Sequence, residues 1–148
     1  MKLAPVEEVE NCICEIVKLD EVENIVTNII PEMVKLLKKE RYGVGLAAPQ
    51  VGIKKRFFIA LNVETGKLDT YFNAFYIKNT DGKIYSKESC LTYGADKFAR
   101  VKRYKAIKVI HEVYEDGKMI RKITPAKKVN AIILQHEIDH LSGRTIFN

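Results

Sequence analysis

The sequence has few cysteines and no long hydrophobic run. No apolar stretch in its 148 residues approaches the roughly 18 residues that a membrane-spanning helix needs. The opening segment turns acidic at Glu7 and Glu8 and lacks the apolar core of a secretory signal. The three cysteines, Cys12, Cys14 and Cys90, are an odd number, which argues against a disulfide framework. We therefore expect a cytoplasmic protein with reduced thiols and no membrane contact.

The sequence also lacks linkers, repeats and low-complexity segments, so we expect a single domain over residues 1–148. Apolar residues make up 47% and charged residues 30%, which is typical of a globular protein. The formal charge is +6, but the small basic groups are spread along the whole chain, interleave with acidic residues and do not form one block with aromatics between. This distribution argues against direct nucleic-acid readout and leaves only loose attraction to an anionic surface.

The spacing of apolar residues predicts one helix, several strands and a second helix. Residues 20–41 carry an apolar stripe at helical spacing, with Asp20 and Glu23 as a capping box and Gly43 beyond the end. Pro31 should kink or split this helix. Asp116-Gly117 predicts a hairpin turn. The predicted strands cover residues 57–61, 71–77, 106–114 and 118–123.

A second helix is expected from Thr124, as N-cap, and Pro125, at the first helical position, to about Ser142. Gly143 would close it. One face of this helix should pack on the core and continue into the histidines described below. That face holds Val129, Ile132, Ile133, His136 and His140. The predicted class is α+β, with antiparallel β-sheets packed around a C-terminal metal-binding helix and with an N-terminal amphipathic helix.

The C-terminal helix carries the run His136-Glu137-Ile138-Asp139-His140, an H-E-x-x-H pattern. Residues four apart on a helix lie on the same face, so His136 and His140 can bind one metal ion. Glu137 lies beside them, where it could act as a general base. Because only eight residues follow His140, we expect the third ligand to come from an earlier segment.

Candidates for this third ligand are His111, Cys90 and any of the carboxylates. His111 alternates with apolar residues on a predicted strand, which favours a packed histidine. Cys90 lies between strands among turn-forming neighbours, where a nearby metal would stabilise its thiolate. Together with an H-E-x-x-H run that lacks a downstream partner, Cys90 is the favoured ligand.

The segment Gly43–Gln50 is rich in glycine and alanine and ends in an amide side chain. Its small residues allow close approach of the backbone to a ligand. It lacks the lysine of a phosphate-binding loop and does not match a dinucleotide fingerprint. A tight helix-to-strand turn is the alternative interpretation.

Three segments, taken in order, resemble the peptide deformylase family, which carries G-x-G-x-A-A-x-Q, E-G-C-L-S and Q-H-E-x-D-H motifs. The resemblance spans about residues 15–147 and includes Asn73 at a strand position where the family often has asparagine. Here the three motifs read Gly43-Val44-Gly45-Leu46-Ala47-Ala48-Pro49-Gln50, Glu88-Ser89-Cys90-Leu91-Thr92 and Gln135-His136-Glu137-Ile138-Asp139-His140.

The resemblance implies a metallohydrolase acting on a linear amide, with Cys90, His136 and His140 as metal ligands. Glu137 would be the general acid and base. The oxyanion would be held by Gln50 and the backbone N–H of Leu91, while Gly45 would bind substrate through its backbone. Ligand type alone indicates zinc, whereas the resemblance implies Fe²⁺ as the native divalent ion, with Zn²⁺, Ni²⁺ or Co²⁺ able to substitute.

The implied substrate is an N-formylmethionyl peptide, which would lose its formyl group as formate. Val44, Ile132 and Ile133 are expected to line the slot for the methionine side chain. Glu88 is expected near the substrate and the ligands, paired with Arg103. We expect a monomer that needs no nucleic acid or membrane for its activity.

Two residues depart from the family motifs. Ser89 replaces a glycine and Thr92 replaces a serine, so the loop at Cys90 is expected to differ slightly. The chain also ends soon after the metal helix, as in short organellar or phage-encoded forms, which leaves only weak ribosome association. A catalytically inactive metal-binding relative and a metallopeptidase are the two alternative functions.

Overall fold

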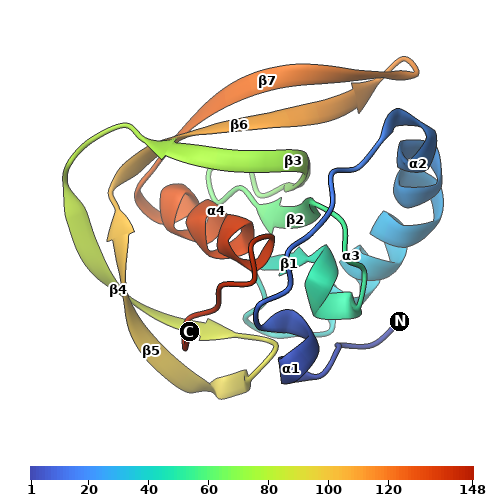
Figure 1. Cartoon of the computed structure of the whole chain (residues 1–148). Coiled ribbons are helices and arrows are strands. Elements are labelled where there is room, and N and C mark those ends of the chain that lie inside the picture. The colour runs from blue at the N-terminus through green and yellow to red at the C-terminus, as the bar shows by residue number, and fades with distance from the viewer.

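The computed structural model describes all residues, 1–148, and has the predicted α+β architecture with antiparallel sheets (Figure 1). Helix α4 (Lys128–His140) lies in the centre of the molecule, surrounded by strands on one side and by the N-terminal segment on the other. None of the helices is both long enough and apolar enough to cross a membrane.

The N-terminal helical region is divided by a π-helical turn just before Pro31, in agreement with the predicted kink or split at this proline. Helix α1 (Val6–Val9) is short; α2 (Leu19–Asn24) runs into a π-helical turn (Ile25–Ile29), and α3 (Ile30–Lys38) follows with Pro31 in its first turn. Proline is tolerated in the first turn of a helix because a backbone N–H at that position has no acceptor within the helix, so its absence costs no hydrogen bond.

The predicted capping box at Asp20 and Glu23 is wrong. Lys18 is the N-cap residue of α2, and its backbone N–H donates to Glu21 Oε1 at 3.0 Å. The glutamate three residues beyond the true N-cap therefore makes the reciprocal contact that a capping box requires. The predicted helix also ran too far, because α3 ends at Lys38.

The larger sheet contains five strands in the order β1-β2-β3-β6-β7, each antiparallel to its neighbour. Asp116 and Gly117 both have positive φ, at 50° and 73°, and form the predicted two-residue hairpin turn between β6 and β7. The strands are β1 (Gly45–Ala47), β2 (Phe57–Leu61), β3 (Leu68–Lys78), β6 (Ala106–Glu115) and β7 (Lys118–Lys127).

Strand β7 continues through the residues predicted to start the last helix. Thr124 is not an N-cap. On the inner face of the sheet, its hydroxyl is hydrogen-bonded to His111 Nε2 at a distance of 2.7 Å. Pro125 lies opposite Lys108 in the ladder, which is possible because β7 is an edge strand with one unpaired side. Helix α4 therefore begins at Lys128.

A separate two-stranded sheet is formed by β4 (Lys83–Cys90) and β5 (Gly94–Tyr104). Cys90 was expected between strands but is the last residue of β4, just before the connecting turn. The register shifts between Ser89 and Cys90, where the ladder is irregular. This irregularity lies directly beside the cysteine.

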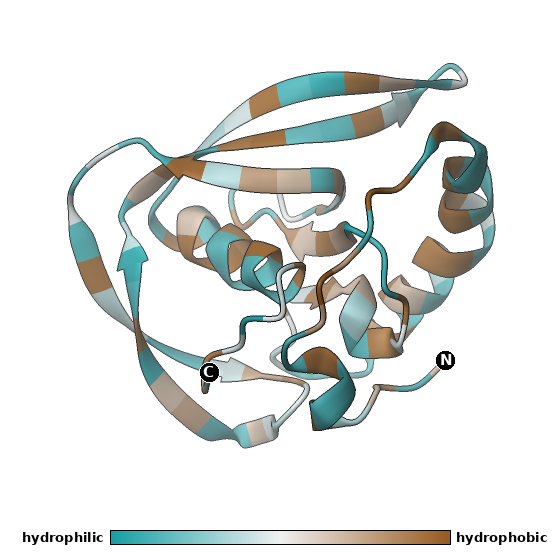
Figure 2. Ribbon diagram, in the orientation of Figure 1, coloured by the Kyte–Doolittle hydropathy of each residue, from teal (hydrophilic) through white to brown (hydrophobic).

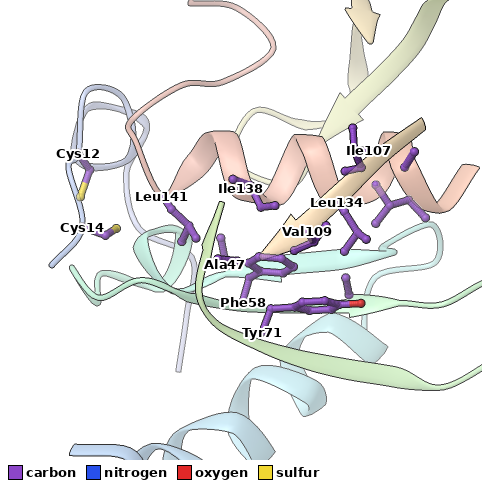
Figure 3. Close-up of a cluster of buried hydrophobic side chains, with 14 residues drawn as sticks. Cys12, Cys14, Ala47, Phe58, Tyr71, Ile107, Val109, Leu134, Ile138 and Leu141 are labelled. Atoms are coloured by element: carbon purple, nitrogen blue, oxygen red, sulfur yellow. The ribbon is translucent and has the colours of Figure 1, made fainter. Parts of the chain in front are cut away.

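Two hydrophobic clusters fill the spaces on either side of β2. Phe58 and Ala60 belong to the cluster against α4, whereas Phe57 and Ile59 belong to the cluster against α2 and α3. Figure 3 shows the α4 cluster, in which the rings of Phe58 and Tyr71 stack with centroids 4.9 Å apart. Both faces of β2 are therefore buried, as its continuous apolar run suggested. By contrast, hydrophilic (teal) and hydrophobic (brown) residues alternate along β6 and β7 (Figure 2).

Asn73 connects the N-terminal segment to the sheet. Its backbone has φ 53° at an irregularity in the pairing of β3 with β6. Its Oδ1 accepts from the Val17 N–H at 2.8 Å, and its Nδ2 donates to the Val17 carbonyl at 3.0 Å and to Glu112 at 2.7 Å. The asparagine noted in the sequence thus has a structural role.

Candidate metal centre

Helix α4 and the end of β4 bring Cys90, His136 and His140 together. Their ligand atoms all lie within 4.8 Å of one another, and Cys90 Sγ is 3.4 Å from His140 Nε2. The imidazole centroids are 4.9 Å apart at 77°. The spacing of four residues on a helix has therefore placed both rings beside the cysteine.

A buried network of charged side chains orients His136. Its Nδ1 lies 2.9 Å from Glu88 Oε1, so Nε2 is free to face the cysteine. Arg103 donates two hydrogen bonds to Glu88, at 2.8 and 2.6 Å, and a third to Asp139 at 2.7 Å. A carboxylate bound to the far nitrogen of a ligating histidine fixes its tautomer and orientation. The expected pairing of Glu88 with Arg103 is present.

The charges of this network shift several pKa values. Burial alone would raise the pKa of Glu88, but hydrogen bonds from Arg103 and His136 lower it to about 2. Burial also opposes protonation of His136, yet its contacts with Cys90 and Glu88 raise its pKa to about 10. Burial holds the pKa of His140 well below its usual value. Two neighbouring imidazoles therefore differ strongly in proton affinity.

Glu137 is buried beside the ligands without a compensating partner. Its Oε1 has no hydrogen bond, and burial raises the pKa of its carboxyl to about 7. Gly45 lies against it, because a Cβ at Gly45 would be 2.5 Å from Glu137 Oε2. Glycine at this position lets the backbone of β1 approach the carboxylate closely.

Gln50 is buried at the 3-10 turn Ala48–Val51, which follows β1. Its Oε1 accepts from the Ala47 N–H at 2.9 Å, and its Nε2 donates to Thr92 Oγ1 at 3.1 Å. The same Nε2 is 3.5 Å from Cys90 Sγ. The Gly43–Gln50 and Glu88–Thr92 segments, which are distant in sequence, thus meet at the cysteine.

A cavity of about 310 Å³ opens above these groups, a volume typical of small-ligand sites. Val44 lies at its rim with 39% exposure, and Ile133 is buried in its wall. Val129 is 52% exposed, so the prediction that it packs on the core is wrong; it lines this cavity instead. The other predicted residues that border the cavity are Gly45, Gln50, Glu88, Cys90, Leu91, Ile132, His136 and Glu137.

The three ligand atoms fit a divalent cation. One thiolate and two imidazoles form a donor set that binds zinc or iron, and the cavity leaves the remaining side open. Glu137 borders the same cavity, and its Oε1 has no hydrogen-bond partner. We therefore regard this cluster as the candidate metal centre.

His111, the alternative third ligand, lies outside the cluster. It is buried on β6 against the ring of Tyr71, with centroids 4.7 Å apart, and it binds Thr124. Burial lowers its pKa. The prediction of a packed histidine is confirmed.

The two departures from the family motifs, Ser89 and Thr92, are compatible with the local backbone and hydrogen bonds. Ser89 does not have positive φ, so this position does not demand glycine. Thr92 retains a hydroxyl and uses it to accept from Gln50. Both substitutions are thus compatible with the site.

The sequence profile described as polypeptide deformylase matches residues 7–148. The chain therefore belongs to this family. It is 38% identical over 130 residues to peptide deformylase 2 of Bacillus subtilis, an alignment that covers 84% of this chain and 68% of the relative. The family predicted from the three motifs is confirmed.

Solved structures from the family have the same fold. Peptide deformylase from Thermotoga maritima superposes with a TM-score of 0.82 at 28% identity, covering 99% of this chain and 94% of the other. A probable peptide deformylase from synechococcus phage S-SSM7 gives a TM-score of 0.78 at 27% identity, covering 99% and 97%.

Sequence reasoning did not find every residue that shapes the site. Asp139, the second partner of Arg103, lies inside the H-E-x-x-H run but was given no role. Tyr42 borders the cavity just before the glycine-rich segment. The position of Asp139, three residues after His136, was an available signal, because such residues share a helix face.

Proposed function

We propose that the chain hydrolyses the formyl group from N-formylmethionyl peptides, as a metal-dependent deformylase that releases formate. The observation that carries this proposal is the buried, unpaired carboxylate of Glu137 beside three converging ligands and an open cavity. A purely structural metal site needs neither the unpaired carboxylate nor the cavity.

Cys90, His136 and His140 would hold the metal, with Fe²⁺ the expected native ion and Zn²⁺, Ni²⁺ or Co²⁺ as substitutes. When bound, a divalent cation supplies a Lewis acid and lowers the pKa of water at the open position. Glu88 supports the site by holding His136 through Nδ1. Glu88 also borders the cavity, so the expected contact with substrate and the orienting role would come from the same residue.

The chain's own groups would carry the proton transfers. Glu137 accepts a proton from the attacking water and later gives it to the departing amine, so water and the formyl amide become formate and a free N-terminus. Gln50 Nε2 and the Leu91 N–H would donate to the developing oxyanion. Loss of one such donor typically costs about 2.7–4 kcal/mol.

The cavity would bind the methionine side chain and the peptide. Val44, Ile132 and Ile133 provide apolar wall, which suits an unbranched thioether. The backbone of Gly45 would pair with the peptide main chain. We further propose that the protein acts as a monomeric single domain in the cytoplasm and contacts the ribosome only weakly.

The decisive experiment measures formate release from a formyl-Met peptide by protein loaded anaerobically with Fe²⁺. Glu137→Gln should retain stoichiometric metal but lose at least about two orders of magnitude in rate. Glu115→Gln, at an exposed glutamate that pairs with Lys122 on β7, is the matched control and should keep full activity. Full activity in Glu137→Gln would refute the mechanism.

Metal content tests the ligand assignment separately. Cys90→Ser should lose the ion, whereas Cys12→Ser, at another buried free cysteine, should keep it. Metal retained without formate release in the native chain would favour the inactive alternative. Cleavage of an unformylated peptide would favour the metallopeptidase.

A further inference from the structure

The β4–β5 sheet has two faces of different character. Residues directly opposite one another in an antiparallel ladder point to the same face, and alternate residues along a strand point to opposite faces. Glu88, Cys90 and Arg103 occupy the inner face, at the metal centre. The paired residues of the outer face are Lys83 and Tyr104, Tyr85 and Lys102, Lys87 and Arg100, and Ser89 and Phe98.

Cations lie over the aromatic rings of this outer face. Lys87 Nζ is 4.7 Å from the centroid of the Phe98 ring, and Arg100 Cζ is 4.9 Å from that of Tyr85. Lys83 Nζ is 4.6 Å from the Tyr104 ring. Rings and cations therefore alternate over the whole face instead of separating into an apolar and a basic half.

The outer face carries positive charge without a balancing acid. Every charged side chain in the paired positions above is a lysine or an arginine. The carboxylates of the hairpin are Glu88, which is buried on the inner face with Arg103, and Asp96, which lies in the irregular part near the tip. The charge of the face is thus complementary to an anionic partner.

The rings are accessible although they are large and apolar. Tyr85 is 63% exposed and Phe98 is 52% exposed. The hairpin lies at the periphery of the molecule in Figure 1, and α4 covers only its inner side. Exposed aromatic residues on a rigid sheet, flanked by cations, are the features that bind unpaired bases and phosphates together.

We propose that the outer face of β4–β5 is a docking surface for single-stranded RNA, bound without base readout. Bases stack on Tyr85 and Phe98, while Arg100, Lys102 and Lys83 contact phosphates. The hydroxyl of the exposed Tyr85 can also pair with a ribose 2′-hydroxyl, which favours RNA over DNA.

The chemistry of the face distinguishes RNA from other anionic partners. A duplex hides the faces of its bases, so the rings can stack only on an unpaired strand. A membrane-surface element instead buries a continuous apolar face below a polar one, which the alternation here does not provide. The proposal does not depend on the deformylase activity.

The test is a titration of a fluorescently labelled, unstructured RNA of about 12 nucleotides with the metal-loaded full chain, at several salt concentrations. Lys83→Gln/Arg100→Gln/Lys102→Gln should weaken binding at least about tenfold and flatten the salt dependence. Tyr85→Leu/Phe98→Leu should weaken it by about tenfold or more with an unchanged salt slope. Lys35→Gln/Lys38→Gln/Lys39→Gln, at the end and C-cap of α3, removes the same charge elsewhere and should change affinity less than about threefold.

A thermal unfolding midpoint close to that of the native chain would show that each variant is folded. The proposal is overturned if the RNA does not bind, or if the α3 variant loses as much affinity as the hairpin variant. Equal affinity for the matched DNA would overturn the assignment to RNA. Binding of anionic lipid vesicles that is as tight as that of RNA, and independent of the rings, would show a general polyanion surface and would also refute it.

Discussion

Glu88 and Glu137 are two buried glutamates that lie on opposite flanks of the same metal centre. Glu88 accepts hydrogen bonds from Arg103 and contacts His136, and its pKa is about 2. Glu137 lies against Gly45 with one oxygen unpaired, and its pKa is about 7. One residue type therefore has two roles here, because one flank supplies partners and the other supplies only burial.

This contrast explains why each flank needs its neighbours. A carboxylate that is always ionised holds a ligand in place, whereas one that can gain and lose a proton serves in catalysis. The following variants exchange or remove these neighbours.

Arg103→Met should have the largest effect, because it leaves Glu88 buried without its cationic partner. Breaking a buried ion pair from one side costs roughly 3–5 kcal/mol. Chemical denaturation would measure the loss in the free energy of unfolding. Lys55→Met, which breaks a more exposed pair with Glu21, is the control and should cost less than about 1 kcal/mol. Equal losses would show that burial does not set the difference.

Gly45→Ala tests the other flank. The added Cβ would meet Glu137 Oε2 at 2.5 Å and displace the carboxylate, and a displacement of this kind can lower kcat about 100-fold. Gly43→Ala meets the flexible end of Leu37 at 2.6 Å and should be much milder. The rates of formate release by the two variants measure this difference. An active Gly45→Ala enzyme would contradict the role of the contact between Gly45 and Glu137.

Glu88→Gln keeps a group near His136 but removes its negative charge. Loss of such an orienting carboxylate weakens metal affinity by about 10–100-fold. Competition with a chelator measures this affinity. If Glu137→Gln weakened the metal equally, the division of roles between the two glutamates would be wrong.

Thr92→Val should have the smallest effect. It removes the acceptor for Gln50 Nε2 and costs about 1 kcal/mol, or roughly fivefold in kcat. Thr92→Ser retains the hydroxyl and should behave as the native chain. An equal loss in both variants would point to packing of the threonine methyl group instead.

Local patterns in the sequence predicted much of this molecule. Helical spacing placed His136 and His140 on one face, Asp116-Gly117 marked the hairpin, and Pro31 marked the split helix. These predictions succeeded because each depends on backbone geometry within a few residues. The boundary at Thr124-Pro125 failed because that signal competed with an edge strand and with the hydrogen bond to His111.

Pairings between distant segments could not be predicted in the same way. The contact of Gln50 with Thr92 and the position of Gly45 against Glu137 join parts of the chain that are more than 40 residues apart. On the outer face of β4–β5, cations and rings already alternate within each strand, but only the pairing of the two strands places Lys87 beside Phe98 and Arg100 beside Tyr85.

The sequence by itself determined the family and the α+β class and predicted the three candidate metal ligands, because these follow from residue type and short-range spacing. Only the tertiary structure decided which glutamate has a lowered pKa and which a raised one, and which face of the hairpin borders the candidate metal centre and which meets solvent. Desolvation and the geometry of ion pairs depend on neighbours in space, and the folded chain alone brings those neighbours together.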